Sequence, residues 1–195
     1  KTAVIDDWHT AMAMVLLRQG ITDVNTSNAD DLKVVGKQLT AMVAATSPKV
    51  TITMYNDLPA GQLGVSQMWS GDIINAQSYL PEGTSTDVLQ YWFPPDGKGL
   101  VDNDLMVALR SGKNPVLAHL FINHMLDAQV SAANTNFVYY MGPNAAAKAF
   151  IDPAILEDPN TNPDQAIIEK LEELLDLGQE VRDEYLSRWQ ILRGG

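Results

Sequence analysis

The sequence predicts an α/β fold, in which short strands alternate with amphipathic helices. Apolar runs typical of strands, such as residues 2–6 and 63–69, lead directly into patterns typical of helices. Strands that alternate with helices build layered α/β architectures. The chain has 195 residues, of which 46% are hydrophobic and 19% charged, and this composition is sufficient for a packed core.

The N-terminal segment predicts a strand followed by a helix. Residues 2–6 (TAVID) form the apolar run, after which Asp6 or Asp7 can cap a helix whose apolar side chains recur at helical spacing. Gly20 is expected to end this helix, because glycine readily adopts the backbone conformation that stops a helix.

The next segment predicts a second helix and a second strand. Residues 27–45 repeat the helical spacing, with Ser27 or Asn28 as the cap. Residues 49–55 alternate apolar and polar side chains, which is typical of a half-buried strand. The two elements extend the alternation of helices and strands.

A third strand is predicted to end in a tryptophan. Residues 63–69 (LGVSQMW) form the strand, and Gly71 lets the backbone turn into a helix over 72–80, which Asp72 is expected to cap. Residues 87–93 predict one further strand, closed by a Pro-Pro-Asp-Gly turn.

The second half of the sequence predicts one more strand and several helices. Residues 105–109 (LMVAL) form an apolar run typical of a strand. Pro115 stands where the first residue of an amphipathic helix over 116–129 is expected. Residues 166–192 predict two acidic helices that are joined near Gly178.

Composition and charge exclude several classes of protein. The net charge is −11, from 24 acidic and 13 basic residues, and this charge disfavours a nucleic-acid partner. No apolar run approaches the roughly 20 residues of a membrane-spanning helix. Cysteine is absent, so disulfides and thiolate metal sites are excluded. The sequence starts at Lys1, and we expect any targeting signal to lie outside it.

The sequence offers little material for catalysis. It contains no motif of a zinc protease, a serine hydrolase or a phosphate-binding loop, and His119 and His124 are spaced to face different sides of a helix. Asp102 and Asp104 precede the predicted strand 105–109, and a spacing of two would place both on one face. Paired carboxylates suit a hard cation, so a small metal-dependent α/β enzyme is one alternative.

Aromatic residues stand at the edges of predicted elements. They are Trp69, Tyr139 and Tyr140. Partial burial with an exposed polar tip is the common fate of such residues. Aromatic faces beside carboxylates would instead suit an organic cation, since a cation over a desolvated tryptophan gains up to about 2 kcal/mol. An exposed ion pair gains only about 0–1 kcal/mol.

Four segments in a fixed order resemble a known family. They are GQLGVSQMWSGD, YWFPPDG, NDLMVALRSGKNPVLAHLFINHMLD and YYMGPNAAAKAFID. Their order resembles the periplasmic or extracellular spermidine/putrescine-binding proteins of ABC importers. The opening VIDDWHTAMAMVLLRQG is similar to the segment that delivers paired aspartates to a helix start in that family. Because this segment lies mid-chain there, the resemblance covers the C-terminal two-thirds of the family's length.

The resemblance implies a periplasmic-binding-protein-like fold of type II, with two lobes that close on a solute. Residues 1–101 would form the second lobe, and residues 102–150 the returning part of the first lobe. Residues 151–195 would form helices that pack on the second lobe. The chain would thus lack most of the first lobe.

The resemblance also implies a function and a binding site. The protein would be a non-catalytic receptor for a small cationic solute such as spermidine or putrescine, without a cofactor or metal. It would act in the periplasm or on the outer side of the cell envelope, with permease subunits as partners. The expected ligand-binding residues are Asp7, Asn56, Trp69, Asp104 and Tyr140, with Asp6, Asp102 and Tyr139 as secondary candidates.

Two departures from the family leave other solutes open. The polyamine binders carry an aromatic residue where this chain has Leu100 and Val101, and their glutamine near the C-terminal helices has no counterpart here. A receptor for an amino acid-like or other organic compound is therefore an alternative. A cleft converted into an interaction module or regulatory subunit is another.

Overall fold

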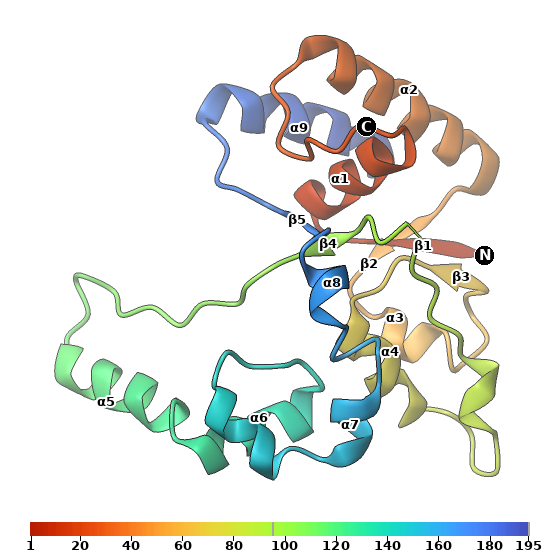
Figure 1. Ribbon diagram of the computed structural model, residues 1–195. Helices are drawn as coiled ribbons and strands as arrows, with labels where there is room; N and C mark the ends of the chain where they lie inside the picture. Colours follow the sequence, from red (N-terminus) through yellow and green to blue (C-terminus); the bar gives the residue numbers. More distant parts are fainter. Residues whose placement is uncertain (95, 195) are drawn as a thin grey trace. The chain divides into compact units, whose positions relative to one another are not determined.

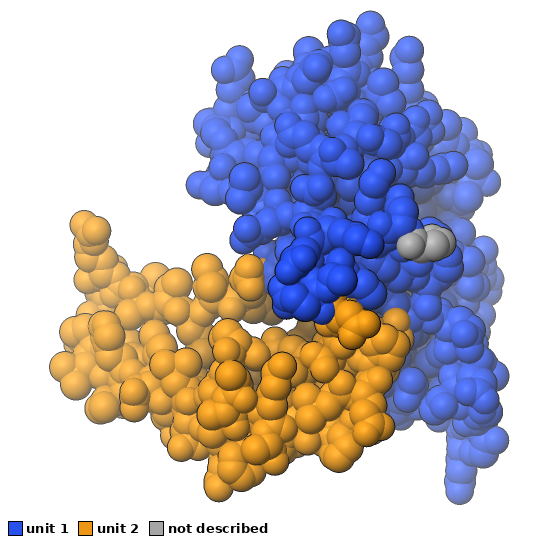
Figure 2. All heavy atoms as spheres, in the orientation of Figure 1, with its two compact units in different colours: residues 1–102, 165–195 blue, residues 103–164 orange. Residues whose placement is uncertain are grey.

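The computed structural model describes residues 1–94 and 96–194, which divide into two compact units (Figures 1 and 2). Unit 1 contains residues 1–102 and 165–195, and unit 2 contains residues 103–164. Figure 2 shows unit 1 in blue and unit 2 in orange. Unit 1 is thus built from two stretches of the chain that are separated in the sequence by unit 2.

Unit 1 contains a sheet of three short parallel strands. The strands are β1 (Thr2–Ile5), β2 (Lys49–Thr51) and β3 (Val65–Ser66). Their order is β2-β1-β3, so β1 is central. Strands are therefore present in each of the first three predicted ranges, although β2 and β3 are shorter than expected.

Three helices pack together with one face of the sheet (Figure 1). They are α1 (Trp8–Arg18), α2 (Ala29–Thr46) and α9 (Gln179–Leu192). Both predicted N-terminal helices are confirmed, with Asp7 and Asn28 as their caps. Their shared core consists of Val4, Ala11, Met12, Leu16, Leu32, Val35, Leu39, Leu177, Tyr185, Trp189 and Leu192.

Two shorter helices cover the other face of the sheet. They are α3 (Met54–Asp57) and α4 (Ser70–Gln77). This second core consists of Ala3, Ile5, Met54, Leu63, Met68 and Ile73. Successive residues of β1 contribute to opposite cores, because side chains alternate across a strand. Unit 1 therefore has a sheet covered on both faces, as parallel sheets require.

Two local predictions in unit 1 are wrong, and a third includes a residue that the structure does not describe. The strand over 49–55 ends at Thr51, because Met54 begins α3 and is buried while Ile52 is exposed. Residues 87–93 form no strand, and only the 3-10 turn η1 (Thr86–Val88) overlaps them. The Pro-Pro-Asp-Gly turn predicted after them includes Pro95, which lies outside the described residues.

The start of α4 also differs from the prediction. The residue before its first turn is Trp69, so Asp72 lies inside the first turn and is not the cap. A carboxylate in this position still favours the helix, because the N-terminal end carries partial positive charge.

The first of the two predicted acidic C-terminal helices is largely absent. Its range holds only the single turn α8 (Gln165–Ile168) and β5 (Glu172–Glu173), which pairs in parallel with β4 (Leu100–Val101). The Asn25 side chain fixes this region, with Nδ2 2.8 Å from the Glu173 carbonyl oxygen and Oδ1 2.8 Å from the backbone nitrogen of Leu175. Tertiary contacts thus override the local helical pattern.

Unit 2 consists of helices and helical turns. They are α5 (Pro115–Met125), α6 (Ala128–Val138), η2 (Ala145–Phe150) and α7 (Pro153–Glu157). Pro115 is the first residue of α5, as predicted. The predicted helix over 116–129 is divided, because the Asp127 side chain accepts hydrogen bonds from two backbone N–H groups and caps α6. The predicted strand over 105–109 has no regular structure.

The core of unit 2 is small. Its buried residues are Ala132, Ala147, Ile151 and Ile155.

The assignment of residues 1–101, 102–150 and 151–195 to particular lobes stays a prediction. Among the described residues of both units, no helix combines the length and apolar character needed to cross a membrane.

Candidate functional site

Three of the five expected ligand-binding residues follow the three parallel strands of unit 1. Asp7 follows β1, Asn56 follows β2 and Trp69 follows β3. The carboxyl ends of parallel strands meet at one edge of a sheet, and ligands of open α/β sheets bind at that edge. Each of the three residues therefore follows a strand end on the side of the sheet where a site is expected.

The paired aspartates after β1 have different surroundings. Asp6 forms an ion pair with Arg193, the residue that follows α9, with a distance of 2.7 Å between Oδ2 and Nη2. Asp7 is half-buried and caps α1, because its Oδ1 accepts a hydrogen bond of 2.7 Å from the Thr10 backbone N–H. Asp7 is the better candidate for binding a cation, since Asp6 already forms an ion pair with Arg193.

Trp69 lies on the surface because of the strand that precedes it. Met68 is buried in the second core, and in an extended chain the following side chain points the other way. Trp69 has extended backbone angles and a side chain that is 37% exposed. The Tyr91 hydroxyl donates a hydrogen bond of 3.4 Å to the Met68 carbonyl, which helps to hold this junction.

A polar network fixes the turn that carries Asn56. The carboxylate of Asp57 is buried and accepts from Lys49 Nζ at 2.7 Å and from Thr53 Oγ1 at 3.3 Å. The Thr53 hydroxyl also lies 2.9 Å from that of Thr51. Asp57 therefore has a structural role, and the partly exposed Asn56 beside it is left as the ligand candidate.

A recess of about 380 Å³ in unit 1 brings Asp7 and Asp102 together. Its lining residues are Asp7, Trp8, His9, Asp102, Leu174, Leu175, Asp176, Leu177 and Arg182. Arg182 is paired with Asp176 at 2.5 Å. The lining carries three carboxylates and one guanidinium group, and this excess of formal negative charge favours a cation.

His9 forms part of the wall of this recess. Its ring stacks on Trp8, with centroids 4.7 Å apart, and meets the edge of Tyr185 at 5.5 Å. Burial lowers the pKa of His9, although the nearby carboxylates of Asp7 and Asp102 oppose the shift. The imidazole is therefore neutral at pH 7, and its buried Nε2 has no hydrogen-bond partner among the residues that the structure describes.

The other expected residues belong to unit 2. Asp104 is exposed and lies outside regular structure. Tyr139 ends α6 in the left-handed conformation, with φ of 63°, and packs against the core of unit 2. Tyr140 follows it and is half-buried. The packing of Tyr139 favours a structural role for that side chain.

The carboxylate pair considered for a metal enzyme lacks the predicted geometry. Asp102 follows β4, and Asp104 does not lie on a strand, so the spacing of two does not place them on one strand face. Within residues 1–94 and 96–194, no group of three metal-ligating side chains could hold a metal ion.

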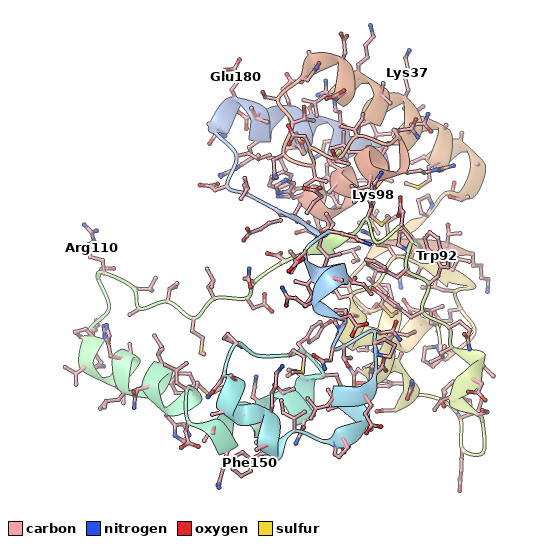
Figure 3. All side chains as sticks on the ribbon, in the orientation of Figure 1. Lys37, Trp92, Lys98, Arg110, Phe150 and Glu180 are labelled. Atoms are coloured by element: carbon pink, nitrogen blue, oxygen red, sulfur yellow. The ribbon has the colours of Figure 1, made fainter. Side chains whose placement is uncertain are left out.

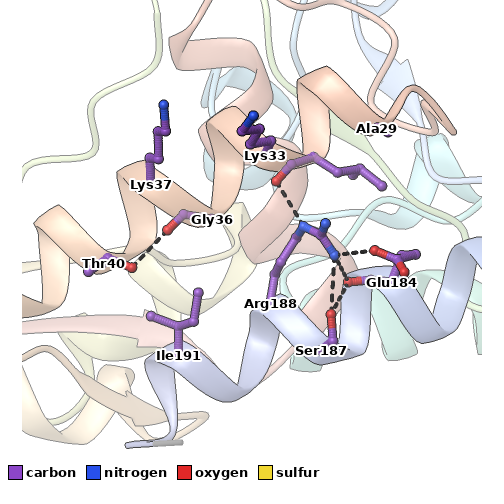
Figure 4. Close-up of a pocket in the computed structure, with 10 residues that line it drawn as sticks. Ala29, Lys33, Gly36, Lys37, Thr40, Glu184, Ser187, Arg188 and Ile191 are labelled. Atoms are coloured by element: carbon purple, nitrogen blue, oxygen red, sulfur yellow. Dashed lines mark hydrogen bonds and ion pairs between the residues drawn. The ribbon is translucent and has the colours of Figure 1, made fainter.

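A second recess, of about 740 Å³, lies between α2 and α9 (Figure 4). Arg188 crosses it, with Nε donating to the Leu32 carbonyl at 2.8 Å and Nη1 bound to Glu184 Oε2 at 2.5 Å. Gly36 faces Arg188, and an added Cβ would lie 3.8 Å from Arg188 Cγ, which is an ordinary van der Waals distance. These contacts fasten α9 to α2, which is a structural role.

Several lining residues of the smaller recess were not predicted from the sequence. The sequence pattern does not single out His9, and residues 174–177 fall within a predicted helix. The one local indication of a role for His9 is its position two residues after Asp7, a predicted ligand-binding residue. The contact between the start of α1 and the segment before α9 is not encoded in any local pattern.

Curated relatives of the chain carry consistent names, although no family model matches it. The putrescine/cadaverine-binding protein of Pseudomonas aeruginosa PAO1 is 30% identical over 158 residues, which are 78% of this chain and 44% of the relative. The chain is thus similar to a polyamine-binding protein over most of its own length. The spermidine/putrescine-binding periplasmic protein of Escherichia coli K12 is 24% identical over 185 residues, 94% of this chain and 51% of the relative. The chain thus spans about half the length of these relatives.

Solved structures agree with this relationship. A protein of Listeria monocytogenes described as a spermidine/putrescine ABC transporter matches with a TM-score of 0.81 and 26% identity, over 99% of this chain and 57% of that chain. The spermidine/putrescine substrate-binding protein PotD of Streptococcus pneumoniae matches with a TM-score of 0.76 and 19% identity, also over 99% and 57%. The predicted periplasmic-binding-protein-like fold and the family resemblance are therefore confirmed. These relatives are binding proteins and not enzymes.

Proposed function

We propose that the chain is part of the solute receptor of an ABC importer and captures a small cationic solute such as putrescine or spermidine. The observation that supports the proposal is that Asp7, Asn56 and Trp69 each follow the carboxyl end of one strand of the parallel sheet. The names of the relatives, which specify putrescine, cadaverine or spermidine, support the same class of solute.

The chemistry of these residues suits a polyamine, in which ammonium groups are separated by methylene groups. Asp7 and Asp102 would bind an ammonium group in the negatively charged recess, and Trp69 would pack against the methylene chain or a cation. Asn56 would accept a further hydrogen bond. Asp104 and Tyr140 are the proposed contributions of unit 2.

The proposed mechanism is closure of two lobes around the solute. A ligand shifts such an equilibrium only by its differential affinity for the closed state. The proposed setting is the periplasm or the outer side of the cell envelope, as for the relatives that are named periplasmic. The proposed protein partners are the permease subunits of the importer.

A receptor for a different small solute is the second candidate. The family places an aromatic residue near Val101, and here the neighbouring Asp102 lines the recess. A carboxylate in this region would favour a ligand with an additional hydrogen-bond donor or positive charge. No arrangement of the described residues favours the metal-dependent enzyme.

Calorimetry with putrescine and spermidine tests the proposal. We expect both solutes to bind the 195-residue chain and Asp7→Asn to weaken binding at least about tenfold, because a charge-assisted hydrogen bond becomes a neutral one. Asparagine caps helices as well as aspartate does, so α1 should remain intact. Trp69→Ala should weaken binding to a similar degree.

Asp183→Asn is the matched control, because it removes a carboxylate from α9 that does not line the recess. Its affinity should equal that of the unmodified chain. Heat with a neutral or anionic solute, and none with either polyamine, would contradict the proposed cationic ligand.

A further inference from the structure

Arg182 of α9 is the one positive charge among the described residues that line the smaller recess, beside Asp7. The other charged residues of the lining are Asp7, Asp102 and Asp176. The polar groups of a polyamine are all amines, which are protonated at neutral pH and are repelled by a guanidinium group. Arg182 therefore has no direct role in binding a polyamine, and an anionic group of the solute is the partner that would give it one.

The ion pair of Arg182 leaves part of its guanidinium group unused. Nη2 lies 2.5 Å from Asp176 Oδ1 and 3.3 Å from the Leu177 carbonyl oxygen. Within residues 1–94 and 96–194, Nε and Nη1 of Arg182 have no hydrogen-bond partner. An arginine side chain has N–H donors on all three nitrogens, so Nε and Nη1 can bind a further acceptor.

Asp176 is a partner that a solute can replace. Its side chain is 90% exposed, whereas that of Arg182 is 38% exposed and lines the recess. An ion pair with so exposed a carboxylate is weak, because water and salt screen it. A carboxylate of a solute that enters the recess is less exposed to water than Asp176, and so binds the guanidinium group more strongly.

Asp7 and Asp102 supply the negative charge of the recess close to His9. Burial lowers the pKa of His9, and the charges of both aspartates oppose this shift. Because such effects fall off with distance, both carboxylates lie near the same imidazole. Two carboxylates in one region suit a solute with two ammonium groups. The apolar part of the lining, which suits the methylene groups of such a solute, includes Trp8, Leu174 and Leu177.

We propose that the solute of this recess is a diamino acid. Arg182 binds its carboxylate, and Asp7 and Asp102 bind its ammonium groups. The inference rests on the proposed function and narrows the class of solute. A diamino acid such as ornithine carries the two ammonium groups of putrescine and, in addition, a carboxylate, so it is still a small solute with a net positive charge.

The charges of the lining favour a diamino acid over other amino acids. An amino acid with an uncharged side chain brings a single ammonium group to a lining in which carboxylates outnumber guanidinium groups. An acidic amino acid brings a second carboxylate, which the aspartates of the lining repel. A diamino acid has the same excess of one sign as the lining, with the sign reversed.

Calorimetry with the 195-residue chain and a matched pair of solutes tests the inference. Ornithine differs from putrescine only by the carboxylate on one terminal carbon. We expect ornithine to bind at least about tenfold more tightly, because charge-assisted hydrogen bonds to Arg182 are added. Lysine and cadaverine differ in the same way and should show the same order.

Arg182→Gln should separate the two solutes. It should weaken ornithine binding at least about tenfold and change putrescine binding by no more than about twofold, since only ornithine has a group that binds the guanidinium. Lys37→Gln is the matched control, because it removes the same charge from the outer surface of α2, outside this recess (Figure 3). Both affinities should be unchanged in the control.

Asp176→Asn distinguishes direct binding from a structural role of the ion pair. It removes the partner of Arg182 but keeps the guanidinium group, so ornithine should bind at least as tightly as it does to the unmodified chain. A structural role of the ion pair instead predicts that Asp176→Asn and Arg182→Gln weaken ornithine binding equally, and that result would overturn the inference.

Two further results would overturn the inference and leave the proposed function in place. One is putrescine binding that is as tight as ornithine binding, and the other is an equal loss of both affinities in Arg182→Gln. The absence of heat with all four solutes would contradict the proposed function itself, and the inference with it.

Discussion

Unit 1 and unit 2 differ in how far the apolar faces of their helices are buried. Unit 1 contains its own parallel sheet and covers both faces of it, so Val4 and Ile5, which are adjacent in β1, are buried in different cores. Unit 2 has no strand among its described residues, and only four side chains form its buried core. The difference shows that a helix of suitable pattern is buried only where a sheet or another helix is present to receive it.

The largest expected effect comes from matched leucine substitutions in the two units. Leu39→Ala in α2 should lower the free energy of unfolding by about 2–5 kcal/mol, because it leaves a cavity in the first core. Leu120→Ala in α5 should change it by at most about 0.5 kcal/mol, since Leu120 is 60% exposed. Urea titrations followed by circular dichroism would measure both values. Equal losses in the two variants would contradict the comparison.

An intermediate effect is expected from the buried hydroxyl of Tyr185. It lies 3.1 Å from the carbonyl oxygens of both Val24 and Thr26, and so connects α9 to the segment between α1 and α2. Tyr185→Phe should lower the free energy of unfolding by about 1–3 kcal/mol, because it leaves buried carbonyl groups without a donor. Chemical denaturation measures the loss.

The same residue predicts a dependence on alkaline pH. The pKa of Tyr185 is raised to about 12 from its ordinary value of 10.0. Burial is the largest cause, and the charges of Asp23 and Asp31 add to it. Because the pKa is raised in the folded chain, the contribution of Tyr185 to the free energy of unfolding is complete below pH 10. This contribution is lost as the pH rises from 10 toward 12. The Tyr185→Phe variant should lose less stability over this interval, and an identical loss in both proteins would argue against the role of the hydroxyl.

The smallest effect is expected from His9 at mildly acidic pH. Because burial lowers its pKa below 6.5, the unfolded chain binds a proton before the folded chain does. The free energy of unfolding should therefore fall as the pH decreases from 6.5 toward the lower folded pKa. His9→Phe should reduce the loss of unfolding free energy between pH 7.5 and 5.5, because the substitution removes the group that titrates. Denaturant titrations of both proteins at the two pH values would test this prediction. An equal loss of unfolding free energy in the two proteins would refute it.

The elements that the sequence predicts correctly are those with local signals. Asp7 and Asn28 cap α1 and α2 as expected, and Pro115 begins α5, because caps and fixed proline angles act within one turn. Residues 87–93 and 105–109 have strand-like patterns but no strand partner. A strand depends on hydrogen bonds to a distant segment, and no pattern within the segment reports whether that partner is present.

The part of the candidate site that depends on local signals could also be predicted from the sequence. The succession of strand, turn and helix in the sequence indicated that Asp7 and Trp69 follow strand ends, and parallel pairing places them on one edge of the sheet. The recess beside Asp7 could not be predicted, because Leu175 and Arg182 reach it from the far end of the chain. The backbone of Leu175 is held there by Asn25, a contact across 150 residues in the sequence.

The packing of α9 into the first core has a consequence for biosynthesis. Tyr185, Trp189 and Leu192 complete a core whose other members lie mainly in α1 and α2. A ribosome makes those two helices first and must extend the chain through all of unit 2 before α9 emerges. The apolar faces of α1 and α2 therefore stay incompletely covered from their own synthesis until α9 is made, and uncovered apolar faces expose a nascent chain to aggregation and to chaperones.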